Sequence, residues 1–161
     1  MKIVKQIQRN YIRREVKSDY LKWWRIIRRY TMIRYDLSTA DLEMILYLYS
    51  EGLFTYWDFK EYANAFGWDR HRFTRLKEDG WIHCWKEKHR GDHRLYEITR
   101  HGRHVCTNMY KMLNYEMQIP ESPNRNPVMK KRTFSDKVLV LSIKKFNEEV
   151  RKKNPQKRIT F

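Results

Sequence analysis

Hydrophobic residues recur at helical spacing in a long stretch near the start of the chain, over residues 5–30. Steps of three or four residues place them on one face of a helix, while most of the nearby Lys and Arg residues lie off that face. A stripe of this kind must be buried, either on the rest of the chain or on a partner subunit. The stripe consists of Ile12, Val16, Tyr20, Trp23, Ile27 and Tyr30.

A second helix is predicted directly after this stretch. Ser38 is a favourable N-cap, and Asp41, three residues later, complements the positive end of the helix. Gly52 is expected to end the helix, because glycine adopts the backbone conformation that follows a last turn. The expected apolar face is Leu42, Ile45, Leu46 and Tyr49.

Two more helix starts follow. Thr55 and Asp58 have the spacing of a capped N-terminus, and Gly67 is expected to end that helix. Asp69 is expected to cap a short helix over residues 69–79 that stops at Gly80. The inward residues expected in the first of these helices are Trp57, Phe59, Tyr62, Ala63 and Phe66.

Two partly alternating stretches, WIHCW and RLYEIT, flank a turn made mostly of Lys, Arg, His, Gly and Asp. Alternation puts every second side chain on one face of a strand, and Gly91 permits the positive φ of a tight turn. The sequence therefore predicts a β-hairpin with a cationic tip. The side chains expected to cover the core are Ile82, Cys84, Tyr96 and Ile98.

The C-terminal third begins with a helix capped by Thr99 and expected over residues 100–118, with Val105, Met109, Met112 and Leu113 as its apolar side. Three prolines then predict an extended linker without a core of its own. A last helix is expected to open at Ser135. Its apolar stripe is Leu139, Ile143, Phe146 and Val150.

The order of helix, turn, helix, turn, helix and hairpin is that of a winged helix-turn-helix. The expected fold class is mainly α with a small β-hairpin wing and with helical extensions at both ends. The predicted parts are a basic amphipathic N-terminal helix (1–35), a winged helix-turn-helix domain (36–118), a Pro-rich basic linker (119–134) and a C-terminal basic helix and tail (135–161).

The net charge is +16, and it lies at the two ends of the chain. Residues 1–35 carry +9, residues 36–118 carry −1 and residues 119–161 carry +8. Basic arms of this size favour a nucleic-acid partner, with an acidic membrane surface as the weaker alternative and mere solubility as the neutral one. With no membrane-spanning run, no signal peptide at the N-terminus and only two cysteines, we expect a cytoplasmic protein, in a host cytoplasm or a virion if viral.

The short helix 69–79 carries the first candidate site. Phe73 and Leu76 share the side that must pack on the preceding helix. The opposite side is polar and cationic, which suits the major groove of double-stranded DNA, although a solvated helix face has the same composition. The residues expected in the groove are His71, Arg72, Thr74 and Arg75.

The hairpin tip, residues 86–94, carries the second candidate site. Its cations and histidines are expected on the phosphate backbone or in the minor groove. The expected contact residues are Lys86, Lys88, His89, Arg90, His93 and Arg94.

A metal site is a weaker alternative for the same region. Cys84 with His89 and His93, or His101 with His104, are conceivable ligands, but no Cys-x2-Cys pair exists and no standard ligand order is present. Neither a phosphate-binding loop nor a nucleophile motif occurs. We therefore expect a protein that is not an enzyme and holds no cofactor.

Residues 37–118 resemble the winged helix-turn-helix domain of MarR-type transcription regulators. The matching pieces are LSTADLEMILYLY, FTRLKEDGWIHCW and GDHRLYEITRHGRHV. The resemblance implies that Asp92 shapes the wing and that Arg94 reaches the minor groove. The chain departs from that family in its short recognition helix, its Pro-linked C-terminal helix and its strongly basic terminal helices. The positions that carry the resemblance are Thr74, Arg75, Asp79, Gly80, Ile82, Asp92, Arg94, Ile98, Thr99 and Gly102.

Two functions fit this pattern. The first is a transcription regulator that binds double-stranded DNA, as a homodimer through the N-terminal stripe and residues 139–150. The second is a structural component of a viral particle or nucleoprotein assembly, in which the winged helix contacts protein and the basic arms pack nucleic acid. The neutral centre of the chain favours the second function, and the cationic helix and hairpin favour the first.

Overall fold

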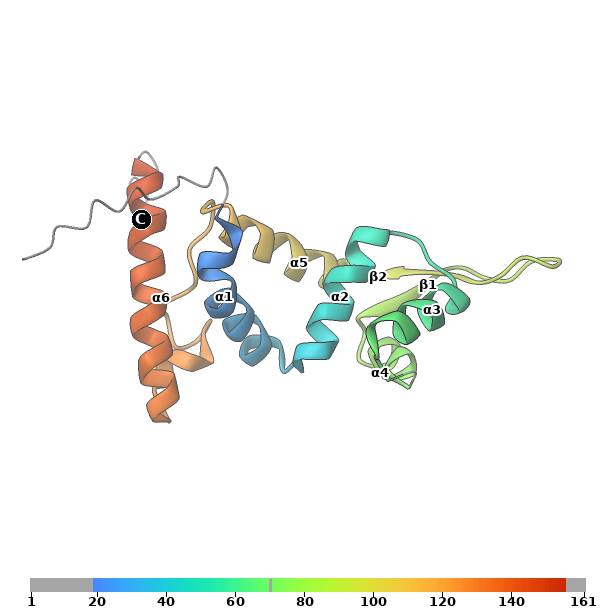
Figure 1. The fold of residues 1–161 in the computed structure, drawn as a ribbon, viewed down its shortest axis with the longest axis horizontal. Coiled ribbons are helices and arrows are strands. Elements are labelled where there is room, and N and C mark those ends of the chain that lie inside the picture. Colours follow the sequence, from blue (N-terminus) through green and yellow to red (C-terminus); the bar gives the residue numbers. More distant parts are fainter. Residues whose placement is uncertain (1–18, 70, 156–161) are drawn as a thin grey trace, which may run out of the picture.

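The computed structural model describes residues 19–69 and 71–155, which form a mainly helical protein with one small antiparallel hairpin. This confirms the predicted helical class with a hairpin, and the order of elements is compatible with a winged helix-turn-helix. Figure 1 shows α6 at one end and the hairpin at the other. The elements are α1 (Tyr20–Tyr35), α2 (Thr39–Glu51), α3 (Tyr56–Phe66), α4 (Arg72–Glu78), β1 (Ile82–Lys86), β2 (Leu95–Ile98), α5 (Arg100–Leu113), the 3₁₀ turn η1 (Pro127–Lys130) and α6 (Phe134–Lys153).

The predicted capping residues start three of these helices. The Ser38 Oγ accepts the Asp41 backbone N–H at 3.1 Å. Thr55 and Asp58 form a reciprocal capping box at the start of α3, and the Thr99 hydroxyl accepts the N–H of Gly102 at the start of α5. These bonds satisfy backbone donors that have no partner inside the helix.

Two helix boundaries differ from the prediction. α5 ends at Leu113 and not near residue 118, because Tyr115 adopts a left-handed conformation (φ 59°) that a continuing helix excludes. α6 begins at Phe134 and not at Ser135, because Thr133 is its N-cap and forms a capping box with Asp136.

The hairpin is held to the helices by its inner face. Ile82, Tyr96 and Ile98 are buried as predicted, whereas Cys84 is only half-buried. The segment between α2 and α3 adds a contact that the sequence did not predict. Phe54 bridges to Tyr96, with N–H···O distances of 3.0 and 2.8 Å between their backbones.

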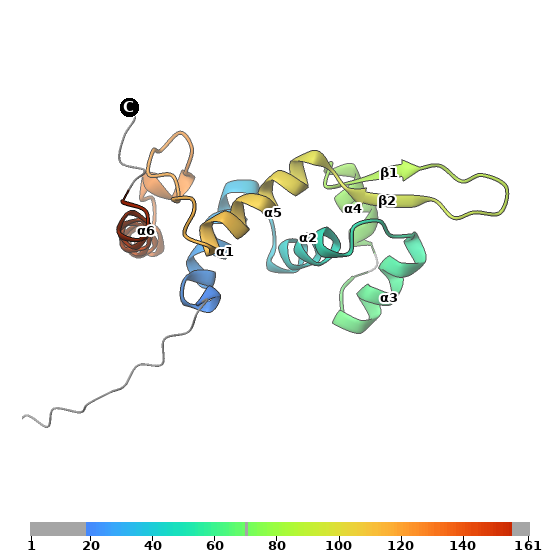
Figure 2. The same cartoon turned by 90° about the horizontal axis from the view of Figure 1, so that it is seen from above.

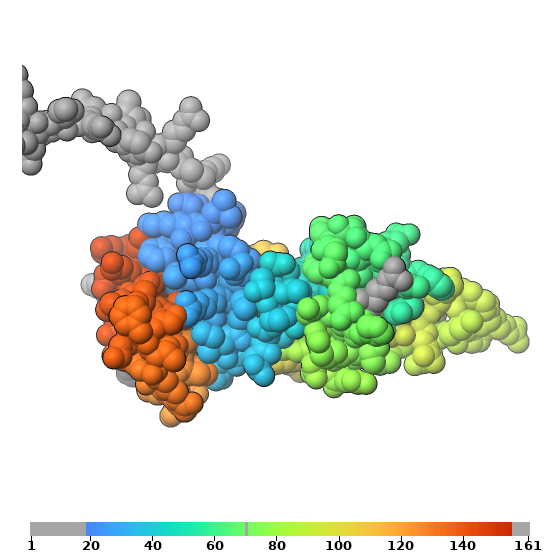
Figure 3. Space-filling view, turned by 60° about the horizontal axis from the view of Figure 1, so that its bottom comes forward, coloured from blue at the N-terminus to red at the C-terminus, as the bar shows by residue number. Residues whose placement is uncertain are grey.

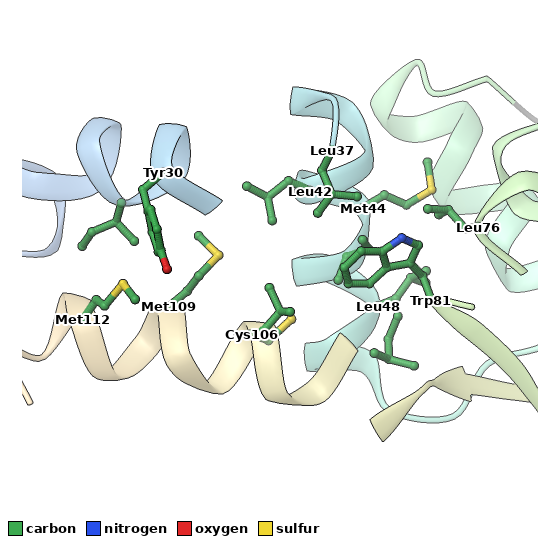
Figure 4. Packing of buried hydrophobic residues seen from close by; sticks show 14 of the residues in the cluster. Tyr30, Leu37, Leu42, Met44, Leu48, Leu76, Trp81, Cys106, Met109 and Met112 are labelled. Atoms are coloured by element: carbon green, nitrogen blue, oxygen red, sulfur yellow. The ribbon is translucent and has the colours of Figure 1, made fainter. Parts of the chain in front are cut away.

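The central core lies where α2 faces α5 and the start of the hairpin. Figure 4 shows Cys106 and Met109 pointing from α5 toward α1 and α2. On α2 the buried apolar residues are Leu42, Met44, Ile45 and Leu48. The predicted Leu46 and Tyr49 are partly buried and pack against this core. The prediction missed Met44 and Leu48, which are buried because α5 and β2, both distant in sequence, also pack on α2.

The inward face of α3 is narrower than predicted. Phe59 and Ala63 are buried, but Trp57 is 57% exposed and Phe66 is 52% exposed. The prediction was wrong for these two residues because solvent covers the outer side of α3. Phe66 packs instead on the ring of Trp68 at the surface, with 4.8 Å between ring centroids.

α1 packs on α6 of the same chain. Trp23 makes an edge-to-face contact with Phe146, with 5.7 Å between ring centroids, and its Nε1 donates to the Glu149 carboxylate at 2.9 Å. The helix predicted over residues 5–30 begins at Tyr20 in the described part and continues to Tyr35. Ile12 and Val16 of the predicted stripe lie outside the described residues.

The apolar stripe of α6 is buried inside the chain. Leu139, Ile143, Phe146 and Val150 are all at most 3% exposed. In the single chain this stripe is not exposed for the expected dimer contact, because α1 and η1 pack on α6. Two of the residues expected in a partner contact from α1, Ile27 and Tyr30, are buried as well.

Residues 119–130 are not an extended linker. Ile119 and Val128 are 1% exposed, and Asn126 uses its amide to bond Pro120 O and Val128 N at 2.9 and 3.1 Å. The buried Asn147 of α6 accepts the Ile119 N–H at 2.9 Å and donates to the Ile119 carbonyl at 2.8 Å. The prolines break regular structure here, but the apolar residues on either side of them, Ile119 and Val128, are buried.

Candidate nucleic-acid interface

α4 is a short helix anchored by two core side chains. Phe73 and Leu76 are buried, as predicted for the side that packs on the preceding helix. Asp69 is not the N-cap that was predicted: its Oδ1 accepts the N–H of His71 at 2.9 Å, His71 is the N-cap, and the helix covers 72–78 and not 69–79. It stops there because Gly80 turns the chain with φ 78°.

The polar side of α4 is exposed at most of the predicted positions. His71, Thr74 and Arg75 are exposed, whereas Arg72 is half-buried, with 20% of its side chain exposed. The helical spacing of the sequence predicted Arg72 on the open side of the helix, and this was wrong for its guanidinium. The group points back to α2, where it bonds the carboxylate of Asp41.

Asp41 binds two arginines of α4 with one oxygen. The Asp41 Oδ1 accepts from Arg72 at 2.5 Å and from Arg75 at 3.0 Å, while its Oδ2 accepts the Ser38 hydroxyl at 2.5 Å. Burial alone raises the pKa of Asp41, but the bonds from Ser38, Arg72 and Arg75 outweigh it and leave the pKa below its ordinary value. The carboxylate is therefore ionised at neutral pH.

The hairpin tip exposes every predicted contact residue: Lys86, Lys88, His89, Arg90, His93 and Arg94. Gly91 has the positive φ expected of the turn, 89°. Two of the four cations lie beside acids, with 3.5 Å between Lys86 Nζ and Asp92 Oδ2 and 2.8 Å between Arg94 Nε and Glu87 Oε2. Exposed pairs of this kind are weak in water, so these cations remain available to a stronger anion.

One of the neighbouring acids shifts the pKa of a tip cation. The charge of Glu87 raises the pKa of Arg94, which keeps the guanidinium fully charged. Lys88 and Arg90 form no ion pair with any residue in the described part of the chain.

α4 and the hairpin lie at the same end of the molecule. The turn at Gly80 joins them directly, and the Trp81 N–H donates to the Leu76 carbonyl at 2.8 Å. Figures 1 and 2 show the hairpin extending beyond α4 and away from α1 and α6. In the space-filling view, neither terminal helix covers α4 or the hairpin on the face shown (Figure 3). The cations thus form two groups, one on α4 and one at the tip.

The residues weighed as metal ligands do not converge. Cys84 Sγ lies 3.3 Å from the Lys86 carbonyl, while His101 packs on Trp81 with 4.8 Å between ring centroids and His104 bonds Asn108 at 3.0 Å. Residues 19–69 and 71–155 contain no group of three His, Cys, Asp or Glu side chains placed to hold a metal ion.

A hollow of about 880 Å³ lies apart from α4 and the hairpin, with walls from α1, α5, residues 116–125 and the end of α6. Arg34 and Arg125 are among its lining residues, and so are the apolar Met109 and Met112. None of its lining residues comes from α4 or from the hairpin, so it is a separate feature of the surface.

Sequence reasoning treated Asp41 only as a favourable residue in the first turn of a helix. Its arginine partners lie 31 and 34 residues further on, and no local pattern signals such a contact. Within the described residues, no helix is both long enough and apolar enough to cross a bilayer. Comparison of the chain with protein-family models, with curated proteins and with solved structures finds no match.

Proposed function

We propose that this chain is a winged-helix protein that binds double-stranded DNA and regulates transcription, in the manner of the MarR-type regulators that its sequence resembles. α4 enters the major groove and residues 86–94 lie on the backbone or in the minor groove. The observation that supports this most is the pairing of an exposed cationic helix with an exposed cationic hairpin at the end that α1 and α6 leave uncovered.

The chemistry of α4 suits a base edge. A helix fits the width of the major groove, and an arginine can donate two hydrogen bonds to guanine. Arg75 is the best candidate for this contact, because its side chain is 50% exposed. Glu78 and Asp79 end the helix and would repel phosphates, so the first turn is the part that approaches the bases.

The hairpin supplies contacts that position the protein. Phosphate contacts fix register without reading sequence. Lys88 and Arg90 are exposed and lack an acidic partner among the described residues, so each can neutralise a phosphate. The basic ends of the chain, residues 1–35 and 119–161, add affinity that does not depend on sequence.

Fluorescence anisotropy on a duplex selected from a random pool tests this proposal. Arg75→Ala should weaken binding by about 1–3 kcal/mol, or roughly 5- to 150-fold, and relax the preference at one base pair. Arg90→Ala should weaken binding to all duplexes alike and reduce the slope of log affinity against log salt concentration by about one.

Lys144→Ala is the matched control, because it removes one positive charge from the exposed side of α6 at the far end of the molecule. If Arg75→Ala behaves like this control in affinity and in sequence preference, α4 does not read DNA.

A second function, a structural module in a nucleoprotein assembly, is favoured by one observation. Phe134, Val138 and Leu141 form an exposed apolar stripe on the outer side of α6, at spacings of four and three residues. Such a protein would copurify with a fixed protein partner and show no preference among duplexes. A DNA reader loses affinity steeply as salt rises but keeps its preference.

A further inference from the structure

A carboxylate from α2 restrains the two arginines of α4. Asp41 lies in the first turn of α2, is 8% exposed, and its Oδ1 lies 2.5 Å from Arg72 Nη1 and 3.0 Å from Arg75 Nη2. The two arginines differ in accessibility, with side chains 20% and 50% exposed. Arg72 is therefore the more buried of the two arginines, and Arg75 is the one that reaches the surface.

The restraint matters because α4 has few other anchors. The helix has seven residues, and His71 at its N-cap makes no side-chain capping bond. Helices this short are not stable by themselves. The link from α2 therefore fixes the angle of α4 together with the buried Phe73 and Leu76, and it holds Arg75 in one pose before any ligand arrives.

Asp41, Arg72 and Arg75 together carry one positive charge more than they carry negative charges. One carboxylate serves two guanidiniums, and the Arg72 Nε has no hydrogen-bond partner although it is buried. Both arginines would gain from a second anion. A phosphate is such an anion, and it would compete with Asp41 for the guanidinium donors of both arginines.

We propose that Asp41 is a positioning residue that sets the sequence selectivity of α4: it presents Arg75 to base edges in one pose and withholds Arg72 from phosphates. This inference rests on the proposed DNA-binding function. Preorganised groups lose less freedom when they bind, so the restrained Arg75 favours the duplex that matches its pose. Free arginines bind any phosphate, and selectivity falls.

The test compares Asp41→Asn with the unaltered full chain on a selected duplex and on a scrambled duplex, across a salt series. We expect the ratio of the two affinities to fall about tenfold. Affinity for the scrambled duplex should rise severalfold at low salt, and its salt slope should steepen by about one, because a further cation becomes available to phosphate.

Glu43→Gln is the matched control. Glu43 is an exposed acid on the same helix, two residues from Asp41, so the substitution changes the net charge equally without releasing the arginines. If Asp41→Asn shifts the affinity ratio no more than this control does, the inference is overturned.

Asp41→Glu tests the position of the carboxylate separately from its charge. It also provides a second variant in case Asp41→Asn does not fold. It keeps the negative charge but moves the carboxylate by one methylene. We expect a reduced affinity ratio with an unchanged salt slope, and an unchanged ratio would overturn the positioning role. If the unaltered chain shows no preference for any duplex, both the proposed function and this inference fail. If the unaltered chain shows a preference and both Asp41 variants keep it, only the inference about Asp41 is overturned.

Discussion

Asn147 offers the sharpest test of how the C-terminal part of the chain is held. This residue of α6 is fully buried, and its side chain bonds both backbone groups of Ile119, at 2.9 and 2.8 Å, and donates to the Glu121 carboxylate at 2.7 Å. Replacing it with alanine leaves the N–H and the C=O of Ile119 buried without partners. Glu121 is less affected, because Arg151 still bonds it at 3.0 Å.

The expected loss follows from these bonds. A buried backbone group without a partner costs about 1–3 kcal/mol, so two such groups lower the free energy of unfolding by about 3 kcal/mol. This is a large share of the roughly 5–15 kcal/mol that stabilises a typical domain. For a chain of this size it corresponds to a fall in melting temperature of about 6–12 °C.

Urea denaturation followed by circular dichroism measures this loss, and amide hydrogen exchange of Ile119 localises it. Lys144→Ala on the exposed side of α6 is the control, and surface substitutions of this kind change stability by less than about 0.5 kcal/mol. If Asn147→Ala is no less stable than this control and the Ile119 amide keeps its protection, the packing of residues 119–130 on α6 is not what stabilises them.

Three further predictions concern other sites. Thr55→Ala removes the hydroxyl that accepts the Asp58 N–H at 3.1 Å and should lower the free energy of unfolding by about 1 kcal/mol in urea titrations; an unchanged midpoint would contradict the capping role. Burial raises the pKa of Glu149, but bonds from Lys22 and Trp23 outweigh it and leave the pKa below its ordinary value of 4.5. Its contribution to stability is therefore complete above that value and is lost as the pH falls through the lower folded-state pKa; Glu149→Gln should flatten the acid side of the stability curve, and superimposable curves for the two proteins would refute the reasoning. Burial raises the pKa of the Cys106 thiol to about 12, so iodoacetamide should modify Cys106 only after denaturation, which mass spectrometry detects; equal labelling of the folded chain would show that the thiol is accessible.

Features that depend on neighbours within a few residues were predictable from the sequence. Ser38, Thr55 and Thr99 start helices because each hydroxyl meets an N–H three positions ahead. The alternation of side chains predicted the hairpin, and Gly91 marked its turn, where the structure has a positive φ. In these cases the local geometry limits the chain to few alternatives.

Features that depend on distant partners were not predictable. The spacing of Trp57 fits the inward face of a helix, but within residues 19–69 and 71–155 no element covers that side of α3. The prolines around Ile119 and Val128 predicted a linker, because the pattern does not reveal that α6 returns to bury these residues. At the candidate site, the exposed residues of α4 and of the tip were largely predicted, whereas the direction of Arg72 was not, since Asp41 reaches it from another helix.

α5 joins the two ends of the molecule as one uninterrupted helix. Its fourteen residues span about 21 Å at 1.5 Å per residue, from the Thr99 cap beside the hairpin to the region of α1 and α6 (Figure 2). A stiff rod of this length converts rotation into displacement. A tilt of about 10° about one end moves the other by about 4 Å, which exceeds the tolerance of a hydrogen bond. Because α6 packs on α1 and α1 packs on α5, a displacement of α6 that tilts α5 would move the hairpin as well, without unfolding any helix.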